Sequence, residues 1–327
     1  GRNSTGYGDN LMSEFRQWWE TNVDIKAQED IYKETGRNVT WNMYDATSDQ
    51  RPIFWDNPYW TRFENYQNDG RNRIYGNINL DYEVIDGLNI VGRVTLDSYN
   101  EIREQRRAVG SVAQEFGISK FDEQSGYQRE DRSVSEINYD LMATYTKDLS
   151  DKFSLYALVG TNLRRQDFES VIQSTVGGLA IPGLYAVSNS VLTPPIPTET
   201  LTEKEVFGVF GNLSLGFNNM LYLDLSARQD KSSALPIENN TYFYPAASLS
   251  WIFSEMVDAN WLNLGKIRVN YATVGSDTGP LNTKDTYIRG DNFGSAILTT
   301  ASSTKNNPNL KPEYSTSYAV VGEFAMF

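Results

Sequence analysis

Apolar and polar residues alternate along nine segments of this chain, and that alternation constrains the fold more than any other feature. In residues 73–84 the even positions carry Ile74, Ile78 and Leu80, while the odd positions are mostly polar or charged. Successive side chains of a β-strand point to opposite sides of a sheet, so this segment has one apolar face and one polar face. The pattern predicts β-strands with two chemically different faces.

The same alternation recurs in eight further segments, which are 88–97, 136–145, 153–159, 207–217, 221–230, 243–251, 266–271 and 314–324. Short turns are expected near 85–87, 148–151 and 218–219, and a somewhat longer one near 254–262. Asp86-Gly87 is typical of a tight hairpin turn. Long polar segments, expected to be loops, lie at about 100–132, 165–203, 231–241 and 276–312. Short and long connections therefore alternate along the chain.

This arrangement favours a membrane barrel over a soluble sandwich. Transmembrane barrels combine short turns at one end, long loops at the other, and strands that are apolar outside and polar inside. The predicted luminal faces carry many charges, too many for a dry core, namely Arg93, Asp97, Asp140, Asp224, Arg228, Lys266 and Arg268. The predicted fold is all-β, an antiparallel transmembrane barrel with long extracellular loops. A sheet with protein on one side and water on the other is the alternative for any single strand.

Composition removes several classes of function. The chain contains neither cysteine nor histidine, which excludes thiolate nucleophiles, Cys/His zinc sites and imidazole bases. Its net charge of −13 argues against nucleic-acid binding. Asp224 and Asp230 beside Arg228 could imitate a glycosidase pair, but wall polarity explains them more simply. We predict no enzyme activity, no cofactor and no metal site.

One helix is expected at about 11–34, with Gly36 as its C-cap. Five tryptophans in the first 60 residues are candidates for a substrate cavity, because sugar rings stack on aromatic faces. They are Trp18, Trp19, Trp41, Trp55 and Trp60. The competing interpretation is that the pair Trp18 and Trp19 packs the loop onto the barrel or a partner.

The nine strands are expected to be part of a larger closed barrel, because every strand edge in lipid must be paired and bacterial barrels close with an even strand number. Residues 1–70 are predicted to form an extracellular loop region, and residues 71–327 part of the barrel.

Several motifs, in order and spacing, resemble the barrel of SusC/RagA-type TonB-dependent transporters of Bacteroidetes. The resemblance covers about 57–322, with departures at Lys231, Asn270, Ala319 and Val321. The motifs are Asn57-Pro58-Tyr59-Trp60, Arg71-x-Arg73-x-Tyr75-Gly76-Asn77, Arg228-x-Asp230-x-Ser232-Ser233, Tyr244-Pro245, Ser248-x-x-Trp251-x-Phe253-Ser254-Glu255, Lys266-Ile267-Arg268-x-Asn270-Tyr271-Ala272-x-x-Gly275 and Asn307-Pro308-Asn309-Leu310-Lys311-Pro312-Glu313.

The resemblance implies a barrel of about 22 strands with a plugged lumen, of which this chain would supply under half. It also implies an outer-membrane location, a SusD-like surface lipoprotein over the external mouth, and TonB acting through a plug domain that this chain lacks. The expected function is import of a glycan or oligopeptide. The alternatives are a barrel that serves as an interaction platform without transport, and an outer-membrane enzyme with a carboxylate site above the rim.

Overall fold

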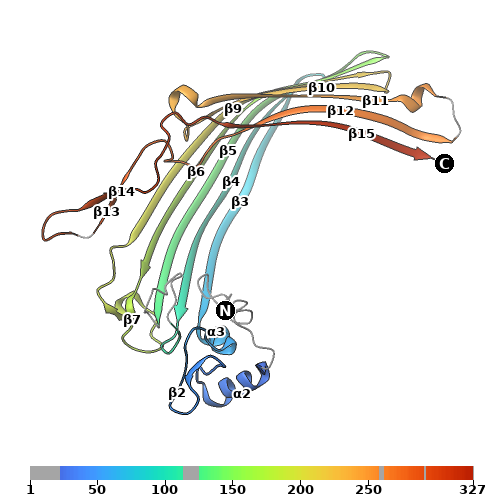
Figure 1. The fold of residues 1–327 in the computed structure, drawn as a ribbon. Coiled ribbons are helices and arrows are strands. Elements are labelled where there is room, and N and C mark those ends of the chain that lie inside the picture. Colours follow the sequence, from blue (N-terminus) through green and yellow to red (C-terminus); the bar gives the residue numbers. More distant parts are fainter. Residues whose placement is uncertain (1–22, 113–124, 258–260, 291, 327) are drawn as a thin grey trace. The chain divides into compact units, whose positions relative to one another are not determined.

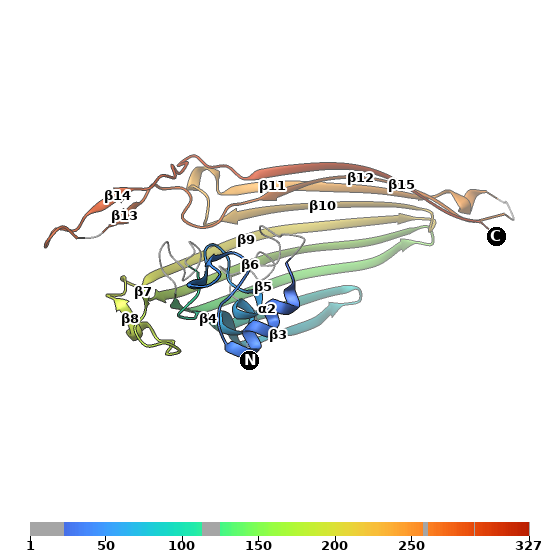
Figure 2. The same ribbon diagram turned by 60° about the horizontal axis from the view of Figure 1, so that its bottom comes forward.

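The main element of the computed structural model is a nine-stranded sheet, within the described residues 23–112, 125–257, 261–290 and 292–326 (Figure 1). The strand order is β15-β12-β11-β10-β9-β6-β5-β4-β3, so each strand lies beside its neighbour in sequence among the long strands (Figure 2). These strands are β3 (Tyr66–Ile85), β4 (Leu88–Arg107), β5 (Gly126–Ser150), β6 (Phe153–Ser174), β9 (Thr198–Phe217), β10 (Leu221–Ser232), β11 (Thr241–Ile252), β12 (Leu262–Ser276) and β15 (Glu313–Met326).

All nine predicted segments lie in these nine strands, so the all-β fold is confirmed. The two tightest predicted turns are confirmed as well. Gly87 joins β3 to β4 with φ of +79°, and Asn218 and Asn219 join β9 to β10 with φ of +49° and +56°. Glycine and asparagine tolerate this left-handed region, which places Gly87 in a two-residue connection and Asn218 and Asn219 in a three-residue connection that ends at Met220.

The predicted loops at 100–132 and 165–203 are wrong in part, because strands occupy much of them. Strand β4 continues to Arg107, β5 begins at Gly126, β6 continues to Ser174 and β9 begins at Thr198. Most side chains on both faces are polar there, which interrupts the apolar alternation. The backbone ladder continues nevertheless, since its hydrogen bonds do not depend on side-chain polarity.

The remaining elements are short. Helices α2 (Ile25–Thr35) and α3 (Pro58–Glu64) accompany three two-stranded sheets and three 3₁₀ turns. The small sheets pair β1 (Met43–Asp45) with β2 (Asp49–Pro52), β7 (Val176–Leu179) with β8 (Ser190–Leu192), and β13 (Tyr287–Arg289) with β14 (Thr299–Ala301). The 3₁₀ turns are Val187–Asn189, Ile237–Asn239 and Phe253–Met256.

The helix predicted at 11–34 is described only from residue 23 onward. Helix α2 begins at Ile25, because Asp24 has extended backbone angles and its carboxylate caps the N–H of Lys26 at 2.9 Å. A single helix running through Asp24 is therefore wrong. Gly36 ends α2 with φ of +64°, as predicted.

Chain contacts divide the protein into two compact units. The first unit comprises Gly1–Arg73, Tyr99–Val134 and Phe168–Leu201, and the second comprises Ile74–Ser98, Ser135–Asp167 and Thr202–Phe327. The first unit holds both helices and the sheets β1–β2 and β7–β8. The second holds most of the long strands and the hairpin β13–β14.

Strand register gives the sheet of the second unit two distinct faces. One row across β9, β10, β11, β12 and β15 reads Leu215, Leu223, Leu249, Val269 and Val320. The next row, on the opposite side, reads Ser214, Asp224, Ser248, Asn270 and Ala319. We call these sides the apolar face and the polar face.

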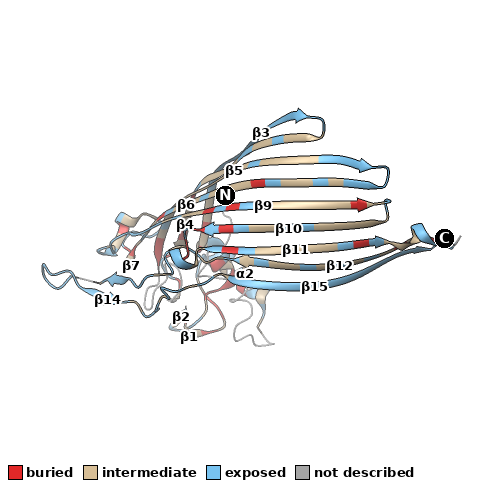
Figure 3. Cartoon of the chain, turned by 90° about the horizontal axis from the view of Figure 1, so that it is seen from above, coloured by how far each residue is buried: buried red, intermediate tan, exposed pale blue. Residues whose placement is uncertain are grey.

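The apolar face is not covered by other described residues. Buried apolar side chains in the described chain are Val39, Ala108, Tyr127, Leu179, Val206, Ala234, Leu235, Tyr242 and Leu262, and none of them belongs to the predicted apolar faces. Along β15 every described residue is exposed (Figure 3). The strands thus present a continuous apolar surface without a protein core behind it.

Among the described residues, no helix has both the length and the hydropathy needed to cross a membrane.

Candidate functional site

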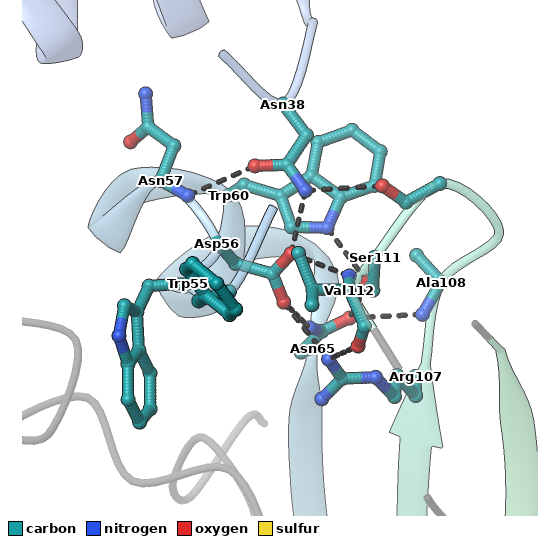
Figure 4. Close-up of polar contacts among 12 residues, drawn as sticks. Asn38, Trp55, Asp56, Asn57, Trp60, Asn65, Arg107, Ala108, Ser111 and Val112 are labelled. Atoms are coloured by element: carbon teal, nitrogen blue, oxygen red, sulfur yellow. Dashed lines mark hydrogen bonds and ion pairs between the residues drawn. The ribbon is translucent and has the colours of Figure 1, made fainter. Parts of the chain in front are cut away.

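The first unit contains a fully buried polar cluster, which we call the anchor network, centred on Asp56 (Figure 4). One carboxylate oxygen of Asp56 accepts hydrogen bonds from Asn38 Nδ2 at 2.6 Å and from the backbone N–H of Val112 at 2.7 Å. The other accepts from Arg107 Nη2 at 3.0 Å. Asp56 and Arg107 are each 1% exposed, so this ion pair lies outside the reach of water.

Asn57 and Asn65 extend the anchor network to both ends of α3. Asn57 caps the helix by accepting from the N–H of Tyr59 at 2.9 Å, and Pro58 occupies the first turn, where its missing N–H costs nothing. Asn65 Oδ1 accepts from the N–H of Ala108 at 2.9 Å. The network therefore ties α3 to the end of β4, which lies 51 residues away in sequence.

Local hydrogen bonds shape the hairpin β1–β2 next to this network. Asp45 accepts from the backbone N–H groups of Ser48 and Thr47, and these bonds hold its pKa well below the usual range. A side-chain hydrogen bond from Arg51 lowers the pKa of Asp49 to about 2. Both carboxylates remain ionised at neutral pH and fix the turn.

Three of the five predicted tryptophans can be placed. Trp18 and Trp19 lie outside the described residues. Trp41 is half-buried just before β1, and Trp55 is half-buried after β2. The indole Nε1 of Trp55 is buried without a hydrogen-bond partner among the described residues. The backbone N–H of Trp55 donates to Asn42 Oδ1 at 3.1 Å.

Trp60 has a clear packing contact. Its indole Nε1 donates to Ser111 Oγ at 2.9 Å, on the segment that follows β4 (Figure 4). This bond ties the ring to the segment that follows β4. The substrate-cavity interpretation of Trp41, Trp55 and Trp60 stays a prediction.

The polar face of the second unit carries the seven charged residues predicted to be luminal, and most of its charges are paired. Arg93 on β4 contacts Asp140 on β5 at 2.8 Å, and Asp140 also accepts from Asn162 on β6 at 2.7 Å. Asp97 lies four residues beyond Arg93 on the same strand and is half-buried. Such pairs satisfy charges across neighbouring strands.

A second group of pairs lies on β9, β10 and the segment after β12. Arg228 contacts Asp230 at 2.8 Å, with its guanidinium 5.3 Å from the ring centre of Phe210. Lys204 contacts Asp277 at 2.8 Å, and Ser232 Oγ donates to the same carboxylate at 2.5 Å. These bonds fasten the start of the 277–312 connection to the sheet.

A third group surrounds a hollow of about 340 Å³ on the polar face of β10, β11 and β12, which we call the charged hollow. Lys266 and Arg268 each come no closer than 3.8 Å to Glu323 on β15. Asp224 makes no hydrogen bond to any described residue. The lining residues are Tyr222, Asp224, Ser248, Ser250, Ile252, Lys266, Arg268 and Asn270.

The sequence patterns did not single out Ser248 and Ser250 in this hollow, Glu323 at 3.8 Å from its two cations, or Asp56 with Arg107 in the anchor network. The serines alternate with Ala247, Leu249 and Trp251, so their position on the polar face could have been predicted. Their proximity to Lys266 and Arg268 depends on strand register, which no single segment reveals.

No group of three or more acidic side chains in the described part of the chain could hold a metal ion.

The comparison with protein families decides the family. The model of the family described as "TonB dependent receptor-like, beta-barrel" matches residues 22–322. The chain belongs to this TonB-dependent receptor family. Its members are transporters rather than enzymes, and the SusC/RagA-type resemblance of the sequence motifs is confirmed.

Solved structures that resemble this chain agree in fold. The chain is similar to the RagAB peptide transporter, with 19% identity and a TM-score of 0.71. It is also similar to the RagAB peptide importer in the "closed-closed" state, with 19% identity and a TM-score of 0.70, and in the "open-open" state, with 18% and 0.67. Each match covers 88% of this chain and 31% of the other, so the chain spans about a third of these proteins. No curated protein matches.

Proposed function

We propose that this TonB-dependent receptor chain forms part of the wall and mouth of an outer-membrane barrel that imports a glycan or an oligopeptide. The supporting observation is the uncovered apolar face that the strand register creates. Leu249 is 45% exposed and Val269 is 49% exposed, in the middle of the sheet. A soluble protein rarely exposes so large an apolar surface, whereas lipid covers it favourably.

The polar face would then line the lumen. Its charge pairs tolerate water or other polar groups, and its ion pairs would be costly in a dry interior. This assignment gives Arg93, Asp97, Asp224, Arg228, Lys266 and Arg268 the luminal role predicted from the sequence.

A SusD-like surface lipoprotein is the proposed partner at the mouth, with TonB acting through a plug domain. The hairpin β13–β14 and the connection around it offer a suitable contact surface. Tyr287 is 75% exposed, Phe293 is 80% exposed and Ile297 is 65% exposed. Exposed aromatic and aliphatic side chains of this kind mark interaction sites.

Deletion and co-purification test the proposal together. We expect deletion of the gene to abolish growth on either oligopeptides or glycans, and the tagged protein to co-purify with a lipoprotein. Unaltered uptake of both nutrient classes, together with no lipoprotein partner, would contradict transport. That result would favour the interaction platform.

A further inference from the structure

Lys231 is a cation at the margin of the apolar face. It has the same parity on β10 as Leu223 and Leu225, and the register places it between Phe207 on β9 and Thr241 on β11. Its side chain is exposed. Lys231 is also one of the positions at which the sequence departs from the SusC/RagA-type motifs. The shared pattern of the family therefore does not account for a cation here.

The protein does not neutralise Lys231 with a carboxylate of its own in the described part of the chain. On the polar face, Arg228 and Lys204 each contact a carboxylate at 2.8 Å. On the side of Lys231, the carboxylate of Glu205 is already held by Arg165 at 2.7 Å. The ammonium of Lys231 is therefore available to an anion from outside the protein.

The apolar face of β10 carries no charge before Lys231. Its earlier positions are Leu221, Leu223, Leu225, Ala227 and Gln229. Ten residue steps separate Leu221 from Lys231, which is roughly 33 Å along a strand. A barrel strand tilted by about 40° covers about 25 Å of membrane height over that length, which matches the apolar band of transmembrane barrels. With lipid on the apolar face, Lys231 lies at the level where the hydrocarbon core ends.

Exposed aromatic rings mark both margins of this band. Phe217 and Trp251 flank the first apolar position of β10, near the short turn. Phe207 and Phe243 lie at the other margin, where they are 43% and 54% exposed. Aromatic residues of transmembrane barrels gather at the two levels where hydrocarbon meets the polar layer. The rings beside Lys231 therefore agree with the level that the strand length gives.

Lys231 lies at the end of β10 that is remote from the turn at Asn218 and Asn219. Short turns of such barrels face the periplasm and long loops face the exterior, so the lipid beside Lys231 belongs to the outer leaflet. A lysine stem lies along apolar neighbours while its ammonium reaches the polar layer. There the ammonium binds a phosphate as a compact point charge.

We propose that Lys231 binds the phosphate group of a lipid headgroup in the outer leaflet. Phe207 and Phe243 would contact the apolar part of the same lipid, a part that inorganic phosphate lacks. The inference rests on the proposed function, since it requires lipid on the apolar face. It adds the residue that recognises the headgroup and the chemistry of that headgroup.

Solid-state NMR on the intact protein in phosphatidylglycerol vesicles tests this contact. Lysine side chains carry ¹⁵N at Nζ, and their signal is dephased by the ³¹P nuclei of the lipid. This dipolar coupling falls with the cube of the distance, so at short mixing times only a lysine in contact with a phosphate loses signal. Lys231→Arg keeps the charge and removes the labelled nitrogen. Lys284→Arg is the matched control, because Lys284 is exposed on the connection that follows β12.

We expect Lys231→Arg to remove from the dephased signal the intensity of one lysine. Lys284→Arg should remove one lysine from the total signal and none from the dephased part. Heat-modifiable migration on gels checks that each variant is folded, and nutrient uptake should be the same in both. Equal dephased signals in the unchanged protein and in Lys231→Arg would overturn the proposal. An equal decrease in both variants would overturn it as well, since any exposed lysine would then contact phosphate.

A second vesicle preparation separates a lipid phosphate from a soluble one. It consists of digalactosyldiacylglycerol, which has no phosphate, with inorganic phosphate in the buffer. We expect no dephased signal from Lys231 there, and a signal as large as in phosphatidylglycerol would overturn the lipid as the partner. Failure of the proposed function looks different, because a protein that does not insert into either kind of vesicle contradicts the lipid contact of the apolar face itself.

Discussion

The anchor network of the first unit and the sheet faces of the second unit use polar residues in opposite ways. In the anchor network, Asp56 and Arg107 are buried and held by several hydrogen bonds, so polarity creates one specific local structure. On the sheet, polarity alternates with apolar residues and separates two environments. Burial of polar side chains therefore determines the local structure of the first region. In the second region, the surroundings of the sheet determine which side chains each face carries.

Loss of the central carboxylate should have the largest effect. Asp56→Ala leaves the buried guanidinium of Arg107 without its partner, and breaking such a pair costs about 3–5 kcal/mol. We expect the amides of α3 to lose protection by that amount in native-state hydrogen exchange. Asp45→Ala, at an exposed carboxylate of the same unit, is the control. Equal loss of protection in the two variants would show that burial of the Asp56 pair does not hold α3.

A charge on the apolar face should have the next largest effect. Leu225→Arg places a cation in the middle of that face, which costs about 2–4 kcal/mol if the face meets the bilayer centre. Ser226→Arg, one residue further and on the polar face, should cost less than about 1 kcal/mol. Denaturant unfolding of the protein in lipid vesicles measures both variants. Equal costs would remove the distinction between the faces.

These two regions also differ in what the sequence could predict. Alternation located all nine strands and the turns at Gly87 and Asn218, because each strand carries its own signal within about ten residues. It missed the strand ends beyond Asn100 and Gln166, where most side chains on both faces are polar. The alternation could not predict the Asp56–Arg107 pair for another reason. The two residues lie on separate elements, and neither local sequence predicts that they form a contact.

The candidate sites also divide into residues that local sequence patterns predict and contacts that depend on distant segments. The polar face of Arg93, Lys266 and Arg268 could be assigned by parity alone. The charged hollow could not, because it requires the pairing of β10, β11 and β12 and the burial of Ser250. Trp60 was predicted as a candidate for a substrate cavity. Its hydrogen bond to Ser111 joins residues 51 apart in sequence, so no local pattern predicts it.

A smaller effect is expected from the indole of Trp60. Trp60→Phe keeps an aromatic ring, although a smaller one, and removes the N–H that donates to Ser111, which should cost at least about 1 kcal/mol. Limited proteolysis between β4 and β5 measures the result as faster cleavage. Trp41→Phe is the comparison variant and should leave the rate unchanged. Unchanged cleavage in Trp60→Phe would show that this bond does not hold the segment.

The smallest expected effect is that of pH on the hairpin β1–β2. The Arg51 hydrogen bond depresses the pKa of Asp49 from 3.8 to about 2, so the carboxylate stabilises the folded hairpin above the higher value. That contribution is lost as pH falls from 3.8 toward 2. NMR titration of the Asp49 carboxyl should show this low midpoint, and Arg51→Gln should raise it. A midpoint near 3.8 in the unchanged protein would contradict the contact.

The central claim is that the two sheet faces meet different surroundings, and a nitroxide scan of positions 223–227 in lipid vesicles tests it most directly. Each position receives a single cysteine and a spin label, and collision rates are measured with oxygen, which concentrates in lipid, and with a water-soluble nickel chelate. We expect a period of two, with oxygen favoured at 223, 225 and 227 and the nickel chelate favoured at 224 and 226. Equal access of the nickel chelate at all five positions would contradict it.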